Sequence, residues 1–266
     1  MTLPPIQAEV LFHIAGLPVT NSMINAWIAV LFFVVVGVAI KTTIKKRPGK
    51  FQNFVEWVFE FMLGFFDQVT GDRKKSERFL PFVGTLFLFI LFSNWIGLMP
   101  GTGSIGLWQM HQGELELIPL LRPANADLNM TLAMAVLAVV FSHVVGIITI
   151  GFFKHANKFI QLGTLWKSFR KGGINILTGI IDLGVGLLEI ISEIAKMVSL
   201  SLRLFGNVFA GEVLLTVIGG IIAFVVPLPF MGLELLVGII QATVFTMLAL
   251  VYLTVATTDP HGAEEH

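Results

Sequence analysis

The stretch Ser199–Glu212, SLSLRLFGNVFAGE, places one arginine, Arg203, inside an otherwise apolar run of helical length. An arginine at the centre of a membrane helix costs about 2.5–3.5 kcal/mol even on lenient insertion scales, so it is rarely kept without a partner or a task. That partner can belong to another chain. We therefore expect the rest of this chain to position Arg203.

The composition is that of a polytopic membrane protein. Of 266 residues, 55% are hydrophobic and only 13% are charged, whereas soluble domains carry about 25% charged residues. The formal net charge of zero argues against nucleic acid as a partner. The chain has no cysteine, which excludes disulfides, thiolate catalysis and thiolate metal sites. We expect neither a cofactor nor a metal.

Apolar runs predict an all-α integral membrane protein with a single membrane domain and five membrane-crossing helices, at 23–40, 79–99, 130–153, 174–226 and 230–256. The fourth run has no proline, and as one helix it would measure about 80 Å against a hydrocarbon thickness of about 30 Å. It must either break at a glycine, such as Gly206, Gly211 or Gly219, or lie strongly tilted. The last two helices are expected to form a long tilted hairpin.

Basic clusters predict the orientation of these helices. Lysines and arginines gather within 41–50, just after the first run, and within 73–78, just before the second, which places both in the cytoplasm. By the same rule 1–22 is an external N-terminus, 101–129 an external loop, 154–173 a cytoplasmic loop and 257–266 a cytoplasmic tail. The first twenty residues contain no lysine or arginine, so no secretory or transit signal is visible. A bacterial plasma (inner) membrane fits best.

Residues 51–70 combine apolar residues at helical spacing with Glu56, Glu60 and Asp67. This pattern favours an amphipathic helix lying on the cytoplasmic face of the membrane. The alternative is a true span that is weakened by its acidic residues.

Polar side chains form a stripe along the helix that carries Arg203. Residues seven apart share a helix face, as do residues four apart. The stripe consists of Glu189, Glu193, Lys196, Ser199, Arg203 and Asn207. Such a stripe within a membrane segment implies a water-accessible path or a covering protein partner. Lys196 either belongs to this path or merely pairs with Glu193 or Glu189, and Glu193 is either functional or structural. For His143 in the third run a structural hydrogen bond is favoured over a role in a polar pathway.

The last predicted helix carries polar residues that can pair with those of the helix that carries Arg203. Glu234 and Gln241 are seven residues apart, and an antiparallel hairpin that pairs Arg203 with Gln241 also pairs Glu212 with Glu234. The carboxylates of Glu212 and Glu234 then lie on the external side of Arg203, while Glu189 and Glu193 lie on its cytoplasmic side. This layout indicates two half-channels separated by a permanent cation, with the ion carried past it by a carboxylate on a moving subunit.

The chain resembles subunit a of the F-type rotary ATP synthases, in the membrane Fo sector. The resemblance rests on SLSLRLFGNVFAGE, the downstream QATVFTMLALVYL at 241–253, GLMPG at 97–101 following Ser93-Asn94, and RPANADLNMTLAMA at 122–135. It covers about residues 20 to 256.

This resemblance implies that Arg203 is the essential stator arginine that faces the rotor-ring carboxylate. It ties Asn207, Glu212 and Gln241 to the ion path and makes Glu189 the cytoplasmic-side acid. The implied partners are the rotor c-ring, the peripheral-stalk b subunits, indirectly the catalytic F1 head, and the lipid bilayer. The chain itself would be non-catalytic and proton-translocating. Two positions depart from relatives: Glu234 stands where some carry histidine, and Met197 where others carry proline, so no proline kink is expected before Arg203.

Two other hypotheses remain. A stand-alone ion-coupled secondary transporter would bind its substrate around Arg203, although the chain has an odd number of spans and no visible internal repeat. A purely structural membrane anchor would pair Arg203 with Glu189 or Glu193.

Overall fold

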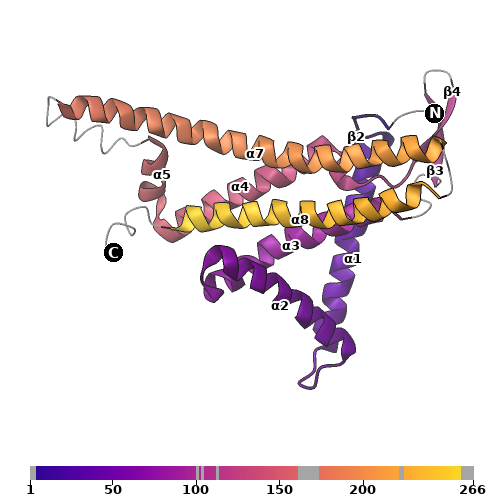
Figure 1. The fold of residues 1–266 in the computed structure, drawn as a ribbon, viewed down its shortest axis with the longest axis horizontal. Helices are drawn as coiled ribbons and strands as arrows, with labels where there is room; N and C mark the ends of the chain where they lie inside the picture. Colours follow the sequence, from indigo (N-terminus) through magenta and orange to yellow (C-terminus); the bar gives the residue numbers. More distant parts are fainter. Residues whose placement is uncertain are drawn as a thin grey trace.

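The computed structural model describes residues 4–99, 102, 105–111, 114–160, 174–221 and 225–258. Its main elements are long helices, arranged as Figure 1 shows. They are α1 (Asn21–Thr43), α2 (Lys50–Thr70), α3 (Arg73–Gly97), α4 (Leu128–Ile150), the short α5 (Phe152–Ile160), α7 (Ile174–Ile221) and α8 (Pro227–Thr257).

Five of these helices, α1, α3, α4, α7 and α8, are long and apolar enough to cross a membrane. The predicted class, an all-α integral membrane protein, is therefore confirmed. Helix α7 runs without interruption for 48 residues, so the alternative of a break at a glycine is wrong. It lies alongside α8 in a long hairpin, and the pair crosses α1 in Figure 1.

Several segments that we expected to be loops form regular structure. Near the N-terminus, β1 (Val10–Ile14) and β2 (Leu17–Thr20) pair in an antiparallel hairpin, which turns at Ala15 and Gly16, both with positive φ. A second hairpin joins β3 (Gly106–His111) to β4 (Glu114–Pro119), and a 3-10 turn follows at Ala124–Ala126. Short strands with few alternating residues give weak signals beside long apolar runs, which explains why they were missed.

The predicted cytoplasmic loop 154–173 is also partly helical, because α5 occupies its beginning. Gly151, with φ of 94°, ends α4, and the chain turns there into α5, which runs at a steep angle to α4 in Figure 1. A left-handed φ of this kind suits glycine and strains other residues. The rest of that loop, 161–173, and most of the predicted tail, 259–266, lie outside the described residues.

Helix α2 packs against α3 and α8 through Met62, Leu63 and Phe66, which are buried. Arg73 at the start of α3 fastens the corner between α2 and α3, because it donates hydrogen bonds to Glu60 at 2.8 Å and Asp67 at 3.0 Å. Helix α2 is not among the five membrane-spanning candidates. Its position on the membrane surface stays a prediction.

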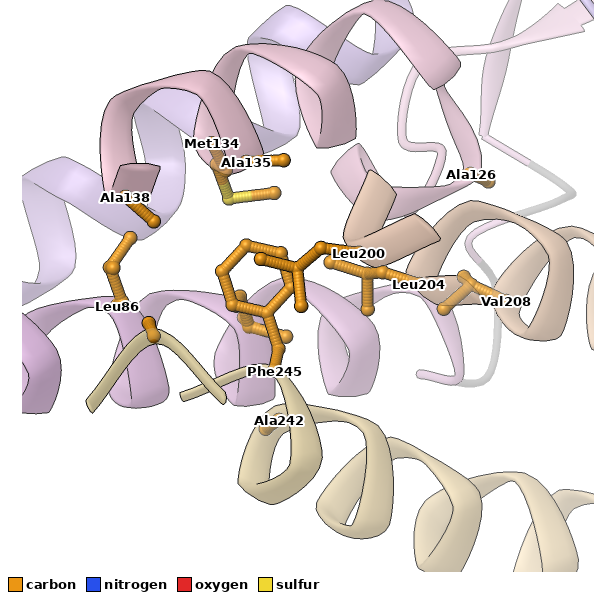
Figure 2. Close-up of a cluster of buried hydrophobic side chains, with 12 residues drawn as sticks. Leu86, Ala126, Met134, Ala135, Ala138, Leu200, Leu204, Val208, Ala242 and Phe245 are labelled. Atoms are coloured by element: carbon orange, nitrogen blue, oxygen red, sulfur yellow. The ribbon is translucent and has the colours of Figure 1, made fainter. Parts of the chain in front are cut away.

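The main core lies where α3, α4, α7 and α8 meet (Figure 2). Helix α7 contributes Leu200, Leu204 and Val208, which are four residues apart and therefore share one face. The cluster around Phe245 of α8 also contains small residues, namely Ala135 and Ala138 of α4 and Ala242 and Ala249 of α8 itself. Small residues let helix backbones approach closely, which is how membrane helices gain packing energy.

Candidate functional site

The buried face of α7 determines which way the polar side chains on the same helix point. Because Leu200, Leu204 and Val208 point into the bundle, the side chains one position earlier lie on its outside. Ser199, Arg203 and Asn207 are all exposed. No ion pair to Arg203 exists among the described residues. In this structure the arginine therefore stands on an open helix face, and the anchor hypothesis that paired it with Glu189 or Glu193 gains no support.

Helix α8, which packs along α7, carries the polar side chains Tyr252 and Gln241. Tyr252 lies within electrostatic reach of Arg203, Lys196 and Glu193. Gln241 is partly buried, and its neighbour Ala242 packs in the same cluster as Leu204. Within the described part of the chain, no hydrogen bond joins Gln241 to Arg203. The expected proximity of the two segments is present, but their direct hydrogen bond is not.

The predicted hairpin register is close to the observed one. The carboxylate of Glu234 lies directly against Gly211, and a Cβ at that position would overlap it. Glu234 is thus one residue from its expected partner Glu212. Both carboxylates occupy the end of the hairpin nearest the α7–α8 turn, which we call the turn end.

Glu212 forms an ion pair that sequence reasoning missed. Arg122, with only 2% of its side chain exposed, donates from Nε at 3.1 Å and from Nη2 at 3.0 Å to Oε2 of Glu212. The same guanidinium donates to the backbone oxygens of Pro5 and Gln7 and lies 5.9 Å from the ring centroid of Phe209. Arg122 is the one lysine or arginine in the predicted external loop. Its isolation among acidic residues was the sequence signal that could have indicated an ion pair.

Polar contacts hold the segment around Arg122 in place. Asn25 donates to the Arg122 carbonyl at 2.8 Å, and Ser22 donates to Asp127 at 2.8 Å. Asn125 donates to Asn94 at 2.7 Å. These bonds tie α1 and α3 to the chain entering α4, so the Arg122 side chain is presented to α7 from a fixed backbone.

A second polar cluster lies ten residues before Arg203, on the side of the bundle that carries α5. Lys196 Nζ is 2.7 Å from Oε1 of Glu193, and His143 Nε2 of α4 is 3.3 Å from Oε2. His143 Nδ1 is in turn 3.2 Å from Nε2 of His155 on α5. Glu189 lies one turn earlier on α7 and is partly buried. Sequence reasoning found each residue except His155 and named the pairing of Lys196 with Glu193, which the structure shows, but it did not place His143 beside Glu193.

The described residues contain no group of three histidine, aspartate or glutamate side chains placed to hold a metal ion. The candidate site is therefore two clusters of charged side chains, one at the turn end and one at the α5 end, with the exposed Arg203 between them.

Comparison with known proteins identifies the family of the chain. The family model for the ATP synthase A chain matches residues 22–254. ATP synthase subunit a of Moorella thermoacetica is 30% identical over 244 residues, covering 91% of this chain and 93% of its own. ATP synthase subunit a 1 of Syntrophotalea carbinolica is 32% identical, covering 89% and 86%.

A third relative, from Propionigenium modestum, is named as the sodium-ion-specific ATP synthase subunit a and is 29% identical over 98% of this chain and 82% of its own. The family model covers most of the described helices, including both polar clusters and the whole stripe around Arg203. The resemblance found in the sequence is confirmed: this chain belongs to the ATP synthase A chain family.

Proposed function

We propose that this chain is the ion-translocating stator subunit of a rotary ATP synthase. It is a non-catalytic, multi-pass membrane protein of the Fo sector, and its family membership supports this general role. The finer proposal is that it supplies two half-channels and the arginine that separates them. Its direct partners would then be the rotor c-ring and the peripheral-stalk b subunits, and through them the F1 head.

The observation that carries this proposal is the position of Arg203. The guanidinium lies on an exposed face of a membrane-length helix, and it forms no ion pair within the described residues. A charge left in hydrocarbon would cost several kcal/mol. A rotor subunit that covers this face with a carboxylate removes the cost, because the two charges pair each time a rotor site passes.

The charge distribution supports the two half-channels. Glu212 and Glu234 lie on one side of Arg203, and Glu193, Lys196 and His143 lie on the other. Glu212 is nine residues and Glu193 ten residues from Arg203, so each cluster is about 15 Å from it along α7. Along α7, Arg203 therefore lies between the two clusters.

The chemistry follows from the permanent charge of arginine. A guanidinium keeps its proton at any working pH, so it cannot pass ions itself and instead favours an ionised rotor carboxylate beside it. An ion entering one half-channel must bind that carboxylate and travel round with the ring before it leaves by the other. The membrane potential supplies about 2.3 kcal/mol per charge per 100 mV for this rotation.

Replacing Arg203 by alanine tests the proposal. In vesicles that hold the whole complex, we expect Arg203→Ala to abolish coupled ATP synthesis, either by blocking flux or by leaking ions past the stator. Arg47→Ala is a suitable control, because Arg47 is exposed in the turn between α1 and α2. Unchanged flux and synthesis in Arg203→Ala would refute the assignment. A stand-alone transporter is separated by reconstituting the chain without its ring, since only the transporter would then move ions.

A further inference from the structure

Arg122 binds Glu212 through one oxygen only. The guanidinium donates from Nε at 3.1 Å and from Nη2 at 3.0 Å, and both hydrogen bonds end on Oε2. Among the described residues, no hydrogen bond reaches Oε1 of Glu212. Arginine–carboxylate pairs often use both oxygens in a fork. The position of this guanidinium is therefore set by more than the carboxylate it binds.

The N-terminal segment holds the other donors of the guanidinium. Nη2 of Arg122 also donates to the Pro5 carbonyl at 2.8 Å, and Nη1 donates to the Gln7 carbonyl at 3.4 Å. A shift of the guanidinium toward Oε1 of Glu212 would stretch these two bonds. On α7, Phe209 precedes Glu212 by three residues, and its ring centroid lies 5.9 Å from Cζ of Arg122. Ring and carboxylate therefore approach the guanidinium from the same side of α7.

The backbone of Arg122 is fixed as well. Asn25 of α1 donates to its carbonyl at 2.8 Å. The next residue, Pro123, packs so closely on the end of α3 that a side chain at Gly97 would overlap its ring. The Arg122 side chain is 2% exposed, whereas 19% of the Glu212 side chain stays exposed. An ion therefore reaches this pair from the side of the glutamate.

These contacts decide which oxygen of Glu212 can carry a proton. Arginine has only donors and keeps its charge at any working pH. A proton on Oε2 would turn the acceptor of both hydrogen bonds into a hydroxyl, whose own hydrogen would crowd the two N–H groups. A proton on Oε1 leaves Oε2 as a carbonyl oxygen that still accepts both bonds. Exchange at Oε1 thus requires no movement of Arg122.

We propose that Arg122 is a positioning residue of the ion path, which binds Oε2 of Glu212 and so leaves Oε1 as the oxygen that takes up and releases a proton. The proposal rests on the proposed function of the chain as a stator and makes the proton the ion at this site. When a proton arrives, an O–H bond forms at Oε1, and Arg122 keeps its bonds to Oε2. When the proton leaves, the ion pair is restored in the same geometry.

Two more carboxylates lie near this pair. Glu234 of α8 lies against Gly211, the residue before Glu212. Glu9 of the N-terminal segment is within electrostatic reach of Glu212, and it accepts a hydrogen bond from Asn21 at 3.4 Å. Among the described residues, Arg122 forms an ion pair with Glu212 and with neither of the other two. Glu212 is therefore the carboxylate whose orientation the arginine sets.

Infrared spectroscopy on the whole complex tests which oxygen carries the proton. The carbonyl band of protonated Glu212 is the band, seen on acidification, that Glu212→Gln removes. With the proton on Oε1 the carbonyl oxygen is Oε2, whose two hydrogen bonds lower the stretching frequency. Arg122→Gln offers fewer and uncharged donors, so it should move this band to higher frequency. With the proton on Oε2 the carbonyl oxygen would be Oε1, and the band would not move.

Proton flux in vesicles that hold the complex tests whether this orientation matters for transport. Arg122→Gln should lower the flux by up to about 100-fold, which is what misplacing a reacting group by about 1 Å can cost. Arg122→Lys keeps the charge but loses the planar fork, so its flux and its band should lie between those of the wild type and Arg122→Gln. Arg73→Gln is the matched control and should change neither, because Arg73 also pairs with carboxylates but is exposed.

An unmoved band in Arg122→Gln, or a moved band together with wild-type flux, would overturn the proposal. If Arg122→Gln does not assemble with the rotor ring, Arg122→Lys decides by the same two measurements. The infrared band is recorded without ion flux, so an unmoved band leaves the stator assignment standing. Wild-type flux and synthesis in Arg203→Ala would instead refute that assignment, whatever the band shows.

Discussion

The ion pair between Arg122 and Glu212 gives a prediction whose magnitude follows from its burial. The arginine is 2% exposed, the glutamate 19%, and two hydrogen bonds join them at 3.1 and 3.0 Å. Breaking a buried pair by removing one partner costs about 3–5 kcal/mol, because the other charge is left uncompensated. We therefore expect Arg122→Leu and Glu212→Leu each to lower the free energy of unfolding by roughly that amount.

The double variant carries no uncompensated charge and should be much more stable than the sum of the single losses suggests. We expect a coupling energy of about 3 kcal/mol between the two positions, since replacing both members of a buried pair by apolar residues is often nearly neutral. A modest loss remains, because the backbone oxygens of Pro5 and Gln7 also lose the arginine as donor. The free energy of unfolding can be measured by reversible unfolding in mixed detergent for the wild type, the two single variants and the double variant.

Arg73→Leu is the internal comparison for this cycle. Arg73 also contacts carboxylates, those of Glu60, Asp67 and Glu77, but 40% of its side chain is exposed. Exposed pairs contribute only about 0–1 kcal/mol. If the coupling energy between Arg122 and Glu212 falls to that level, the ion pair is solvated in the molecule, and the reasoning from burial is wrong.

Two further predictions concern packing and pH. Gly211→Ala places a methyl group where the carboxylate of Glu234 on α8 lies, so it should lower the free energy of unfolding by about 1–3 kcal/mol and disturb ion flux. The control is Gly219→Ala on the same helix. Its added methyl group meets nothing within 4 Å, so stability should be unchanged or slightly higher. At the corner between α2 and α3, the nearby Ser76 hydroxyl and the Arg73 guanidinium, which donates to Asp67 at 3.0 Å, hold the pKa of Asp67 below its usual value. The stability from Asp67 is therefore fully present above pH about 4 and is lost as the pH falls through its folded pKa. Hydrogen exchange at this corner should rise with acid, and Asp67→Asn should remove that dependence.

Much of the fold was predictable because the bilayer selects long apolar helices. The five apolar runs needed only length and composition, and the antiparallel register of α7 and α8 followed from the spacing of Glu212, Glu234 and Gln241. The observed contact between Glu234 and Gly211 lies one residue from that expectation. These features are local or depend on helical periodicity, so a single sequence carries them.

The contacts between distant segments could not be predicted in the same way. Arg122 and Glu212 are 90 residues apart, and no periodicity relates them. His143 meets Glu193 across two helices, and His155 joins them from α5, which begins just after Gly151, inside the predicted span, and continues into the predicted loop. To predict these contacts one must know which helix faces lie together, and this depends on packing throughout the bundle.

The leucine face of α7 has a consequence for changes in chain length. Leu200, Leu204 and Val208 anchor the helix rotationally, while Glu193 meets His143 two turns earlier on the same continuous rod. One residue inserted between Glu193 and Leu200 would turn one contact relative to the other by about 100° and shift it by about 1.5 Å. An insertion or deletion there would change how the Glu193 contact lies relative to the level of Arg203 even if every side chain were retained. Substitutions in this segment can be absorbed singly, but its length has to stay the same.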